Sequence, residues 1–239
     1  MGEGDRFCGD CGAAVGGCPS CGEPLTPGKR FCRACGSPVA EFARSSSAES
    51  AAAAGPGYGP DSVAERRVCS VLFCDVVGFT PLSESRDPEA VRELLTQYFA
   101  VARTVVGRYG GMVEKFIGDA VMAVWGTPAA TEGDAERAVR AALDLVAAVE
   151  ALGAEAAVPG LAARAGVVTG EVAVSLGAVG EGMVAGDAVN TAARVQSVAA
   201  AGQVLVDAAT HRLAGNAVGF EEAGSHQLKG KTEPQELWR

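Results

Sequence analysis

The sequence predicts an α+β domain of the ferredoxin-like type, preceded by a small cysteine-rich module. Three observations predict this arrangement. The apolar patterning follows the order strand, helix, strand, strand, helix, strand between residues 68 and 168, which is the split βαβ order. Six of the eight cysteines lie in the first 35 residues. The 239 residues, 48% of them hydrophobic, suffice for one well-buried domain and a small second one.

The first half of the predicted domain begins with an apolar strand. Residues 68–74 (VCSVLFC) are nearly all apolar, as in a central strand that is covered on both faces, and the run ends at Asp75. An Asp-Pro pair at residues 87–88 then marks a helix start, because proline is favoured at the first helical position. Apolar residues recur from there at helical spacing up to Tyr109, where two glycines end the pattern.

The second half of the domain completes the pattern. Residues 112–116 and 120–125 are predicted to be two strands joined by a tight turn at 117–119. A second amphipathic helix is expected over roughly residues 134–152, followed by a strand over residues 163–168.

The amino-terminal cysteines form three Cys-x-x-Cys pairs. In a cytosolic chain this spacing indicates metal binding rather than disulfides. Two pairs separated by ten residues can place four thiolates tetrahedrally around one Zn²⁺ ion: Cys18, Cys21, Cys32 and Cys35. We therefore expect a structural zinc ribbon over residues 1–40, with most of its folding free energy supplied by the metal.

The third pair, Cys8 and Cys11, lacks a partner pair upstream, so the module reads as a partial double ribbon. Two alternatives remain open: the natural chain begins further upstream, or these thiols bind zinc together with another chain. A redox role would need a strand-helix context that this stretch lacks. The module resembles the zinc ribbons found beside signalling domains, which implies an unidentified protein partner.

Composition limits the other partners. Residues 41–65 are rich in Ser, Ala, Gly and Pro and are expected to form a flexible linker. The net charge of -9 argues against nucleic acid and anionic membranes as partners. The start lacks the features of a signal peptide, and the longest uncharged stretch, residues 195–206, is too short to cross a bilayer. We therefore expect a cytoplasmic protein.

Two aspartates are expected to meet at one rim of the sheet. The split βαβ topology makes the first and third strands antiparallel neighbours; Asp75 closes the first and Asp119 precedes the third. Alone, each aspartate would be read as a turn or strand-end residue. Together, two carboxylates repel unless a cation lies between them, and their oxygens suit Mg²⁺ or Mn²⁺.

Four sequence blocks resemble, in order, the signatures of class III nucleotidyl cyclases. They are residues 71–80 (VLFCDVVGFT), 114–126 (EKFIGDAVMAVWG), 186–194 (GDAVNTAAR) and 228–234 (LKGKTEP). The resemblance covers about residues 66–239 and implies the palm-like catalytic domain of that family. The activity it implies is adenylate cyclase: conversion of ATP to 3′,5′-cyclic AMP and pyrophosphate in intracellular signalling.

The resemblance also implies which residues hold metals and phosphates. Two Mg²⁺ or Mn²⁺ ions would bind Asp75 and Asp119, with the backbone carbonyl of Val76 as a further ligand. One ion would activate the ribose 3′-hydroxyl and the other would hold the triphosphate. Backbone amides at the next helix start would bind the β- and γ-phosphates: those of Val77, Gly78, Phe79 and Thr80.

A second set of residues is implied near the carboxyl end. Asn190 and Arg194 lie four residues apart, on one face of a predicted helix. In the family the asparagine orients the ribose and the arginine stabilises the pentacovalent phosphate. One of Lys229 and Lys231 would reach the terminal phosphates. Without the resemblance these are exposed polar side chains, with Asp187 and Arg194 as a surface ion pair.

Class III sites form between two subunits, so the resemblance implies a homodimer and an inactive monomer. One subunit supplies the metal aspartates, and the other supplies the asparagine, the arginine and the purine-reading residues. Residues 170–186, rich in glycine and apolar residues, are expected to form a hairpin arm that reaches the partner.

The purine-reading positions leave the substrate open. Lys115 matches the lysine that typically reads adenine N1 in adenylate cyclases. The second position is Met183, whose thioether is a poor hydrogen-bonding group. ATP is therefore the expected substrate, with GTP as an alternative. Met183 also motivates a second hypothesis, a catalytically silent module that binds nucleotide or dimerises, with the ribbon as its interaction arm. Cys69 and Cys74 are expected in the core.

Overall fold

The computed structural model describes residues 64–175 and 184–239. They belong to one compact unit that spans Tyr58–Arg239. The predictions for the zinc ribbon, for most of the linker and for Met183 lie outside the described residues. The last two residues of the predicted linker, 64 and 65, already belong to the first strand.

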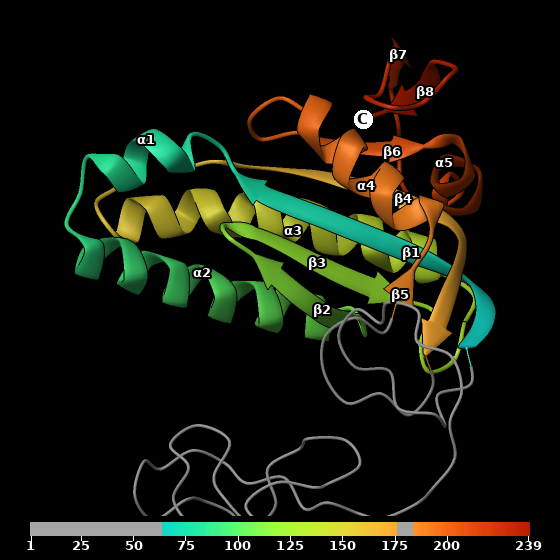
Figure 1. Cartoon of the computed structure of the whole chain (residues 1–239), viewed down its shortest axis with the longest axis horizontal. Coiled ribbons are helices and arrows are strands. Elements are labelled where there is room, and N and C mark those ends of the chain that lie inside the picture. Colours follow the sequence, from blue (N-terminus) through green and yellow to red (C-terminus); the bar gives the residue numbers. More distant parts are fainter. Residues whose placement is uncertain (1–63, 176–183) are drawn as a thin grey trace, which may run out of the picture. The chain divides into compact units, whose positions relative to one another are not determined.

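The described residues build a single sheet with helices on both faces (Figure 1). The strand order is β2-β3-β1-β4-β6-β8-β7, and β5 pairs with β4 outside this path. The strands are β1 (Ala64–Val76), β2 (Met112–Ile117), β3 (Ala120–Trp125), β4 (Ala163–Ser175), β5 (Val184–Ala185), β6 (Val204–Asp207), β7 (Glu222–His226) and β8 (Gln235–Trp238). The helices are α1 (Phe79–Glu84), α2 (Pro88–Arg108), α3 (Asp134–Glu155), α4 (Asp187–Val198) and α5 (Ala208–Ala214).

The predicted order of elements is confirmed. The elements β1, α2, β2, β3, α3 and β4 follow one another as expected, with the short helix α1 as an addition. The first and third strands are antiparallel neighbours, and β4 pairs with β1 on the other side. Both β1 and β4 run to 13 residues, longer than the apolar runs that predicted them, because residues 64–67 of β1 pair with residues 172–175 of β4 and continue the ladder.

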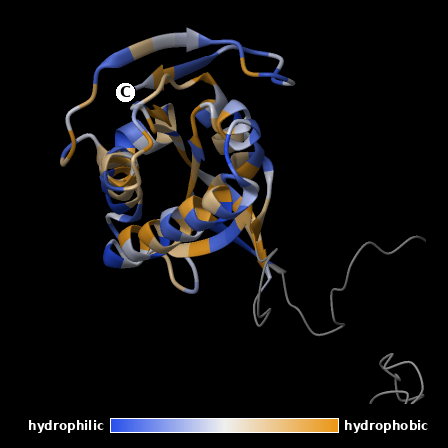
Figure 2. Cartoon of the chain, turned by 90° about the vertical axis from the view of Figure 1, so that its left-hand side faces the viewer, coloured by the Kyte–Doolittle hydropathy of each residue, from blue (hydrophilic) through white to orange (hydrophobic). Residues whose placement is uncertain are grey.

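Alternate side chains of β1 enter two different cores. Leu72, Cys74 and Val76 pack with α2 and α3, whereas Val71 and Phe73 pack on the face covered by α4. Both faces are therefore buried, which explains the uninterrupted apolar run in this strand. Leu72 is fully buried, which stabilises the fold by about 1.5–3 kcal/mol relative to an exposed leucine. Figure 2 shows that the helices carry both hydrophobic and hydrophilic residues, as amphipathic helices do.

The two predicted core cysteines are confirmed as buried residues. Cys69 is 1% exposed and Cys74 is fully buried. Burial raises the pKa of the Cys69 thiol to about 11 and that of Cys74 to about 12. Both thiols therefore stay protonated and pack as small apolar groups.

Helix α4 lies unusually close to the sheet. Its buried face carries Ala188, Ala192 and Val195, as the sequence predicts. A Cβ atom at Gly166 in β4 would lie only 2.4 Å from the backbone nitrogen of Gln196. Only glycine permits this approach, so Gly166 fixes where the carboxyl-terminal turn of α4 meets the sheet.

The elements after α4 were not predicted from the sequence. The strands β6, β7 and β8 have only four or five residues each, too few for a clear alternating pattern. Asp207 caps the start of helix α5, and its side chain accepts a hydrogen bond from the Thr210 amide. Among the described residues, no helix is long and apolar enough to cross a membrane.

Candidate active site

The two predicted aspartates meet at one rim of the sheet. Asp75 pairs with Ala120 in the antiparallel ladder of β1 and β3, and Asp119 directly precedes Ala120. Partial burial raises the pKa of the Asp119 carboxyl to about 6, and the nearby negative charge of Asp75 adds to the shift. A hydrogen bond between the two side chains acts in the same direction. The structure therefore brings together two carboxylates 44 positions apart in the sequence.

Two further side chains hold Asp75. Nη2 of Arg164 lies 3.3 Å from Oδ2 of Asp75, and Nε2 of Gln196 donates to the same oxygen at 3.2 Å. Nη1 of Arg164 also donates to the carbonyl of Ser197 at 2.8 Å. The sequence analysis missed both contacts. A signal existed, because Arg164 is a charge within an apolar strand and Gln196 is a polar residue on the buried side of an amphipathic helix.

These residues suit a magnesium or manganese site. Mg²⁺ is usually bound by one or two carboxylates together with waters and substrate phosphates, rather than by a complete protein cage. The described ranges contain no group of three or more His, Cys, Asp or Glu side chains that could hold a metal, so two carboxylates are what this rim offers. Burial is the main cause of the raised pKa of Asp119, and the negative charge of Asp75, the second cause, is one that a divalent cation would offset.

The segment after Asp75 turns into α1. Val76 ends β1, and the amide of Val77 donates to the carbonyl of Ala162 at 2.8 Å. The Val77 amide is thus engaged in the protein, and of the four amides expected to bind phosphate only those of Gly78, Phe79 and Thr80 stand at the start of α1. Gly78 has a φ of 70°, a left-handed conformation that glycine adopts at little cost, and this turns the chain into the helix.

A second cluster lies between α4 and the loop that joins β7 to β8. Nζ of Lys231 donates to Oδ2 of Asp187 at 2.5 Å, and this contact is the main cause of the lowered pKa of Asp187. A Cβ atom at Gly230 would lie 3.5 Å from Nη2 of Arg194. The structure thus brings Arg194 and Lys231 to the same side of α4, near the exposed Asn190.

This cluster also corrects one sequence-based reading. Asp187 pairs with Lys231, not with Arg194 as the surface ion pair would require. The two candidate lysines differ as well: Lys231 is half-buried, whereas Lys229 is exposed. The sequence pattern could not distinguish the two lysines, because each of them is adjacent to the same glycine, Gly230.

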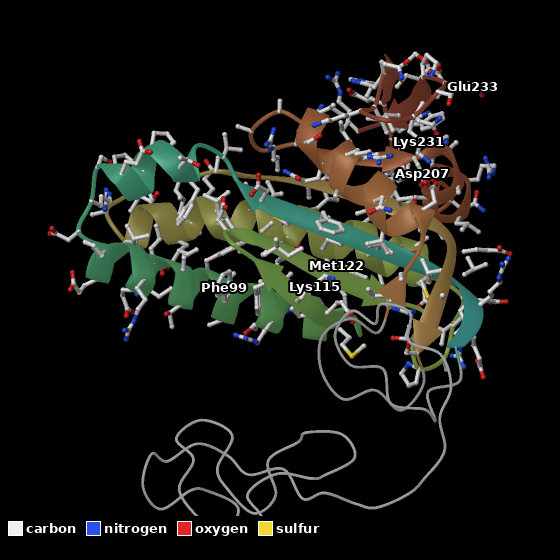
Figure 3. The ribbon with its side chains drawn as sticks, viewed as in Figure 1. Phe99, Lys115, Met122, Asp207, Lys231 and Glu233 are labelled. Carbon is white, nitrogen blue, oxygen red and sulfur yellow. The ribbon has the colours of Figure 1, made fainter. Side chains whose placement is uncertain are left out.

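Lys115 lies on the face of the sheet that α4 covers. It pairs with Met122 across the β2–β3 ladder, and Met122 belongs to the core beneath α4. Figure 3 labels both residues on these neighbouring strands. The next residue, Phe116, points to the opposite face, where its ring centroid lies 4.1 Å from that of Phe99 in α2.

The two clusters lie on different sides of α4. Gln196 reaches Asp75, while Arg194, two residues earlier, lies beside Gly230. Two residues correspond to about 200° around an α-helix, so these side chains point in nearly opposite directions. Within one chain, the aspartate cluster and the Arg194 cluster are therefore separate.

The family model for the adenylate and guanylate cyclase catalytic domain matches residues 63–238. The chain belongs to the class III cyclase family. The domain described above is therefore a nucleotidyl cyclase domain of mixed α+β fold, as the sequence predicts. A second model, for a double zinc ribbon, matches residues 1–36, which supports metal binding by the amino-terminal cysteines.

Relatives include both kinds of cyclase. The chain is 31% identical over 198 residues to adenylate cyclase 1 of Rhizobium meliloti, covering 76% of this chain and 29% of that protein. It is 32% identical over 174 residues to the soluble guanylate cyclase subunit beta-2 of Rattus norvegicus, covering 70% of this chain and 25% of that protein. The chain thus spans less than a third of the length of these two curated relatives.

Solved structures give the same picture. The adenylyl cyclase CyaB from P. aeruginosa matches with a TM-score of 0.70 and 29% identity, over 74% of this chain and 94% of that one. The guanylyl cyclase Cya2 matches with a TM-score of 0.66 and 29% identity, over 73% of this chain and 92% of that one. The similarity therefore supports a nucleotidyl cyclase and leaves the purine to be decided by other arguments.

Proposed function

We propose that this protein is an adenylate cyclase that converts ATP to 3′,5′-cyclic AMP and pyrophosphate. The observation that carries the proposal is the meeting of Asp75 and Asp119 at one rim, with the pKa of Asp119 raised to about 6. Such a pair suits divalent cations, and in-line phosphoryl transfer depends mainly on cations and positioning. When bound, the two metal ions would lower the pKa of the ribose 3′-hydroxyl and neutralise charge on the triphosphate.

The chain's own residues would act around those ions. Asp75 and Asp119 hold them, with the carbonyl of Val76 as a further ligand. Arg164 orients Asp75 through its contact at 3.3 Å. The planar guanidinium of Arg164 also suits phosphate oxygens, and its buried Nε has no hydrogen-bond partner within the part of the chain that the structure describes.

The second half-site would come from another copy of the chain. Arg194 and Lys231 offer two positive charges beside Asn190, and these suit a transferring phosphoryl group and a ribose. Because Asp75 and Arg194 lie on different sides of α4 in one chain, a complete site requires a head-to-tail homodimer. The antiparallel pairing of β4 with β5 fits the predicted hairpin arm that reaches the partner.

The choice of ATP depends on Lys115. An ammonium group donates hydrogen bonds only, and the N1 atom of adenine accepts one, whereas N1 of guanine carries a hydrogen. Lys115 lies on the α4 face of the sheet, which is the face of the second half-site. GTP remains the alternative substrate, because Met183 offers no strong hydrogen bond to either purine.

A direct assay tests the proposal. Full-length zinc-loaded protein is incubated with Mn²⁺ and either ATP or GTP, and cyclic nucleotides are separated and quantified. We expect cyclic AMP to form faster than cyclic GMP. The Asp75→Ala variant serves as the matched control and should form neither. Absence of any cyclic nucleotide across protein concentrations that favour dimers would contradict the proposal.

A second candidate function follows from Met183, the position where the chain departs from the family pattern. In this alternative the domain binds metal-nucleotide or dimerises without turnover, and the zinc ribbon contacts another protein. Calorimetric binding of Mn²⁺ and ATP without product would favour it. In either case we place the protein in the cytoplasm, with no nucleic acid or membrane as partner.

A further inference from the structure

Gln196 is a buried polar residue on an otherwise apolar helix face. Its side chain lies among the buried residues Ala192 and Val195 of α4, and the residue is only 7% exposed. Burying an amide costs free energy unless the amide is hydrogen-bonded. Its Nε2 atom donates to Oδ2 of Asp75 at 3.2 Å, so the contact with Asp75 explains why a glutamine is tolerated at this position.

The backbone of Gln196 is itself held in place. Gly166 allows the backbone nitrogen of Gln196 to come so near β4 that any Cβ atom at Gly166 would clash, at 2.4 Å. The neighbouring carbonyl of Ser197 accepts a hydrogen bond from Nη1 of Arg164 at 2.8 Å. With its backbone fixed from two sides, Gln196 presents its amide to Asp75 from a defined position.

The two donors to Asp75 differ in charge. Arg164 and Gln196 both approach Oδ2, at 3.3 and 3.2 Å. The arginine partly neutralises the carboxylate, whereas the glutamine orients it without neutralising it. A carboxylate that must bind a cation keeps more of its negative charge when a neutral donor holds it.

We propose that Gln196 is a positioning residue for metal binding, which holds the Asp75 carboxylate in the orientation that binds Mg²⁺ or Mn²⁺ together with Asp119. The inference rests on the proposed function, since it concerns the same metal site. Hydrogen-bond partners of metal-binding carboxylates typically change metal affinity or activity by about 10- to 100-fold when they are removed. Gln196 thus links α4 to the metal site of its own chain.

The test measures metal binding rather than turnover. Mn²⁺ binding to the full-length, zinc-loaded protein is followed through the paramagnetic resonance signal of free Mn²⁺, in the presence of 3′-deoxy-ATP, which cannot cyclise. Gln196→Met keeps a similar volume and removes the donor, and Gln196→Asn keeps an amide that is too short to reach. Both should weaken Mn²⁺ binding by about 10-fold or more. The matched control, Gln203→Met, makes the same replacement at a glutamine that contacts the Ala200 amide, and should bind Mn²⁺ like the wild type.

The outcomes separate this inference from the proposed function. Mn²⁺ affinity equal to the wild type in both Gln196 variants would overturn the role of Gln196 alone. A wild type that binds no more Mn²⁺ than Asp75→Ala would contradict the metal site and the cyclase proposal with it. If the Gln196 variants do not fold, the test uses the wild type instead, titrated with Mg²⁺ and followed by NMR spectroscopy. The side-chain amide resonance of Gln196 should then shift while that of Gln203 does not, and an unmoved Gln196 signal would overturn the inference.

Discussion

Nη2 of Arg164 lies 3.3 Å from Oδ2 of Asp75, although 89 positions separate the two residues in the sequence. This contact joins β4 to the end of β1 at the rim where Asp119 also lies. It places one positive charge beside two carboxylates. The arginine thus offsets only part of the negative charge that two carboxylates can carry, and a bound cation could neutralise the rest.

Replacing Arg164 should impair catalysis more than folding. We expect Arg164→Met to lower cyclase activity by at least about 10-fold, because the oxygen of Asp75 loses its charged donor. Arg164→Lys keeps the charge but loses the two-pronged contact with Asp75 and Ser197, and should retain intermediate activity. Cyclic nucleotide formation under saturating Mn²⁺ measures the effect.

Arg66→Met is the matched control for this prediction. Arg66 lies on the neighbouring strand β1, is exposed, and faces Glu171 at 4.0 Å. Loss of such an exposed pair should leave activity near the wild-type level. Equal losses in the Arg66 and Arg164 variants would mean that the contact with Asp75 has no specific role.

The raised pKa of Asp119 predicts a pH-dependent stability without metal. The folded-state pKa of about 6 exceeds the ordinary value of 3.8, so the folded state favours the protonated carboxyl. This contribution to stability is fully present below pH 3.8 and is lost as the pH rises through about 6. In EDTA, Asp119→Asn should therefore gain stability relative to the wild type between pH 4.5 and pH 7.

Urea unfolding at these two pH values measures the effect. Adding Mg²⁺ at pH 7 should stabilise the wild type and leave Asp119→Asn largely unaffected, because the variant lacks one ligand. An unfolding free energy whose pH dependence is the same in both proteins would contradict the account of Asp119.

Lys231 and Lys229 should differ in their effect on nucleotide binding. Lys231 is half-buried, bonded to Asp187, and next to Gly230, which lies beside Arg194, whereas Lys229 is exposed. We expect Lys231→Met to raise KM for ATP by about 10-fold or more, since a charge-assisted contact to phosphate contributes about 1.5–3 kcal/mol. Lys229→Met is the matched control and should change KM less than about twofold. The reverse ranking of the two variants would refute the assignment of Lys231.

The sequence predicts the central part of this fold because its elements carry strong local signals. The apolar run before Asp75, the Asp-Pro start of α2 and the two glycines after Tyr109 are local features, and the split βαβ order follows from them. The meeting of Asp75 and Asp119 was predicted correctly because antiparallel pairing of β1 and β3 fixes it. By contrast, β6, β7 and β8 are too short for any pattern to identify.

Contacts that depend on packing were not predictable in the same way. Gln196 reaches Asp75 because Gly166 admits α4 close to the sheet, and no spacing rule relates residues 166, 196 and 75. The pairing of Asp187 with Lys231 likewise depends on where the loop after β7 returns to α4. Sequence spacing reveals which residues share a helix face, whereas tertiary packing decides what that face touches.

Mixing two inactive variants tests most directly whether the half-sites come from different subunits. Asp75→Ala removes the metal half-site and Arg194→Ala removes the other half-site, so each variant alone should be inactive. Random reassociation of equal amounts makes half of the dimers mixed, each with one intact site of two, so activity should return to about a quarter of the wild-type level. A mixture of folded, dimeric variants that stays inactive, or substantial activity in either variant alone, would contradict the shared site.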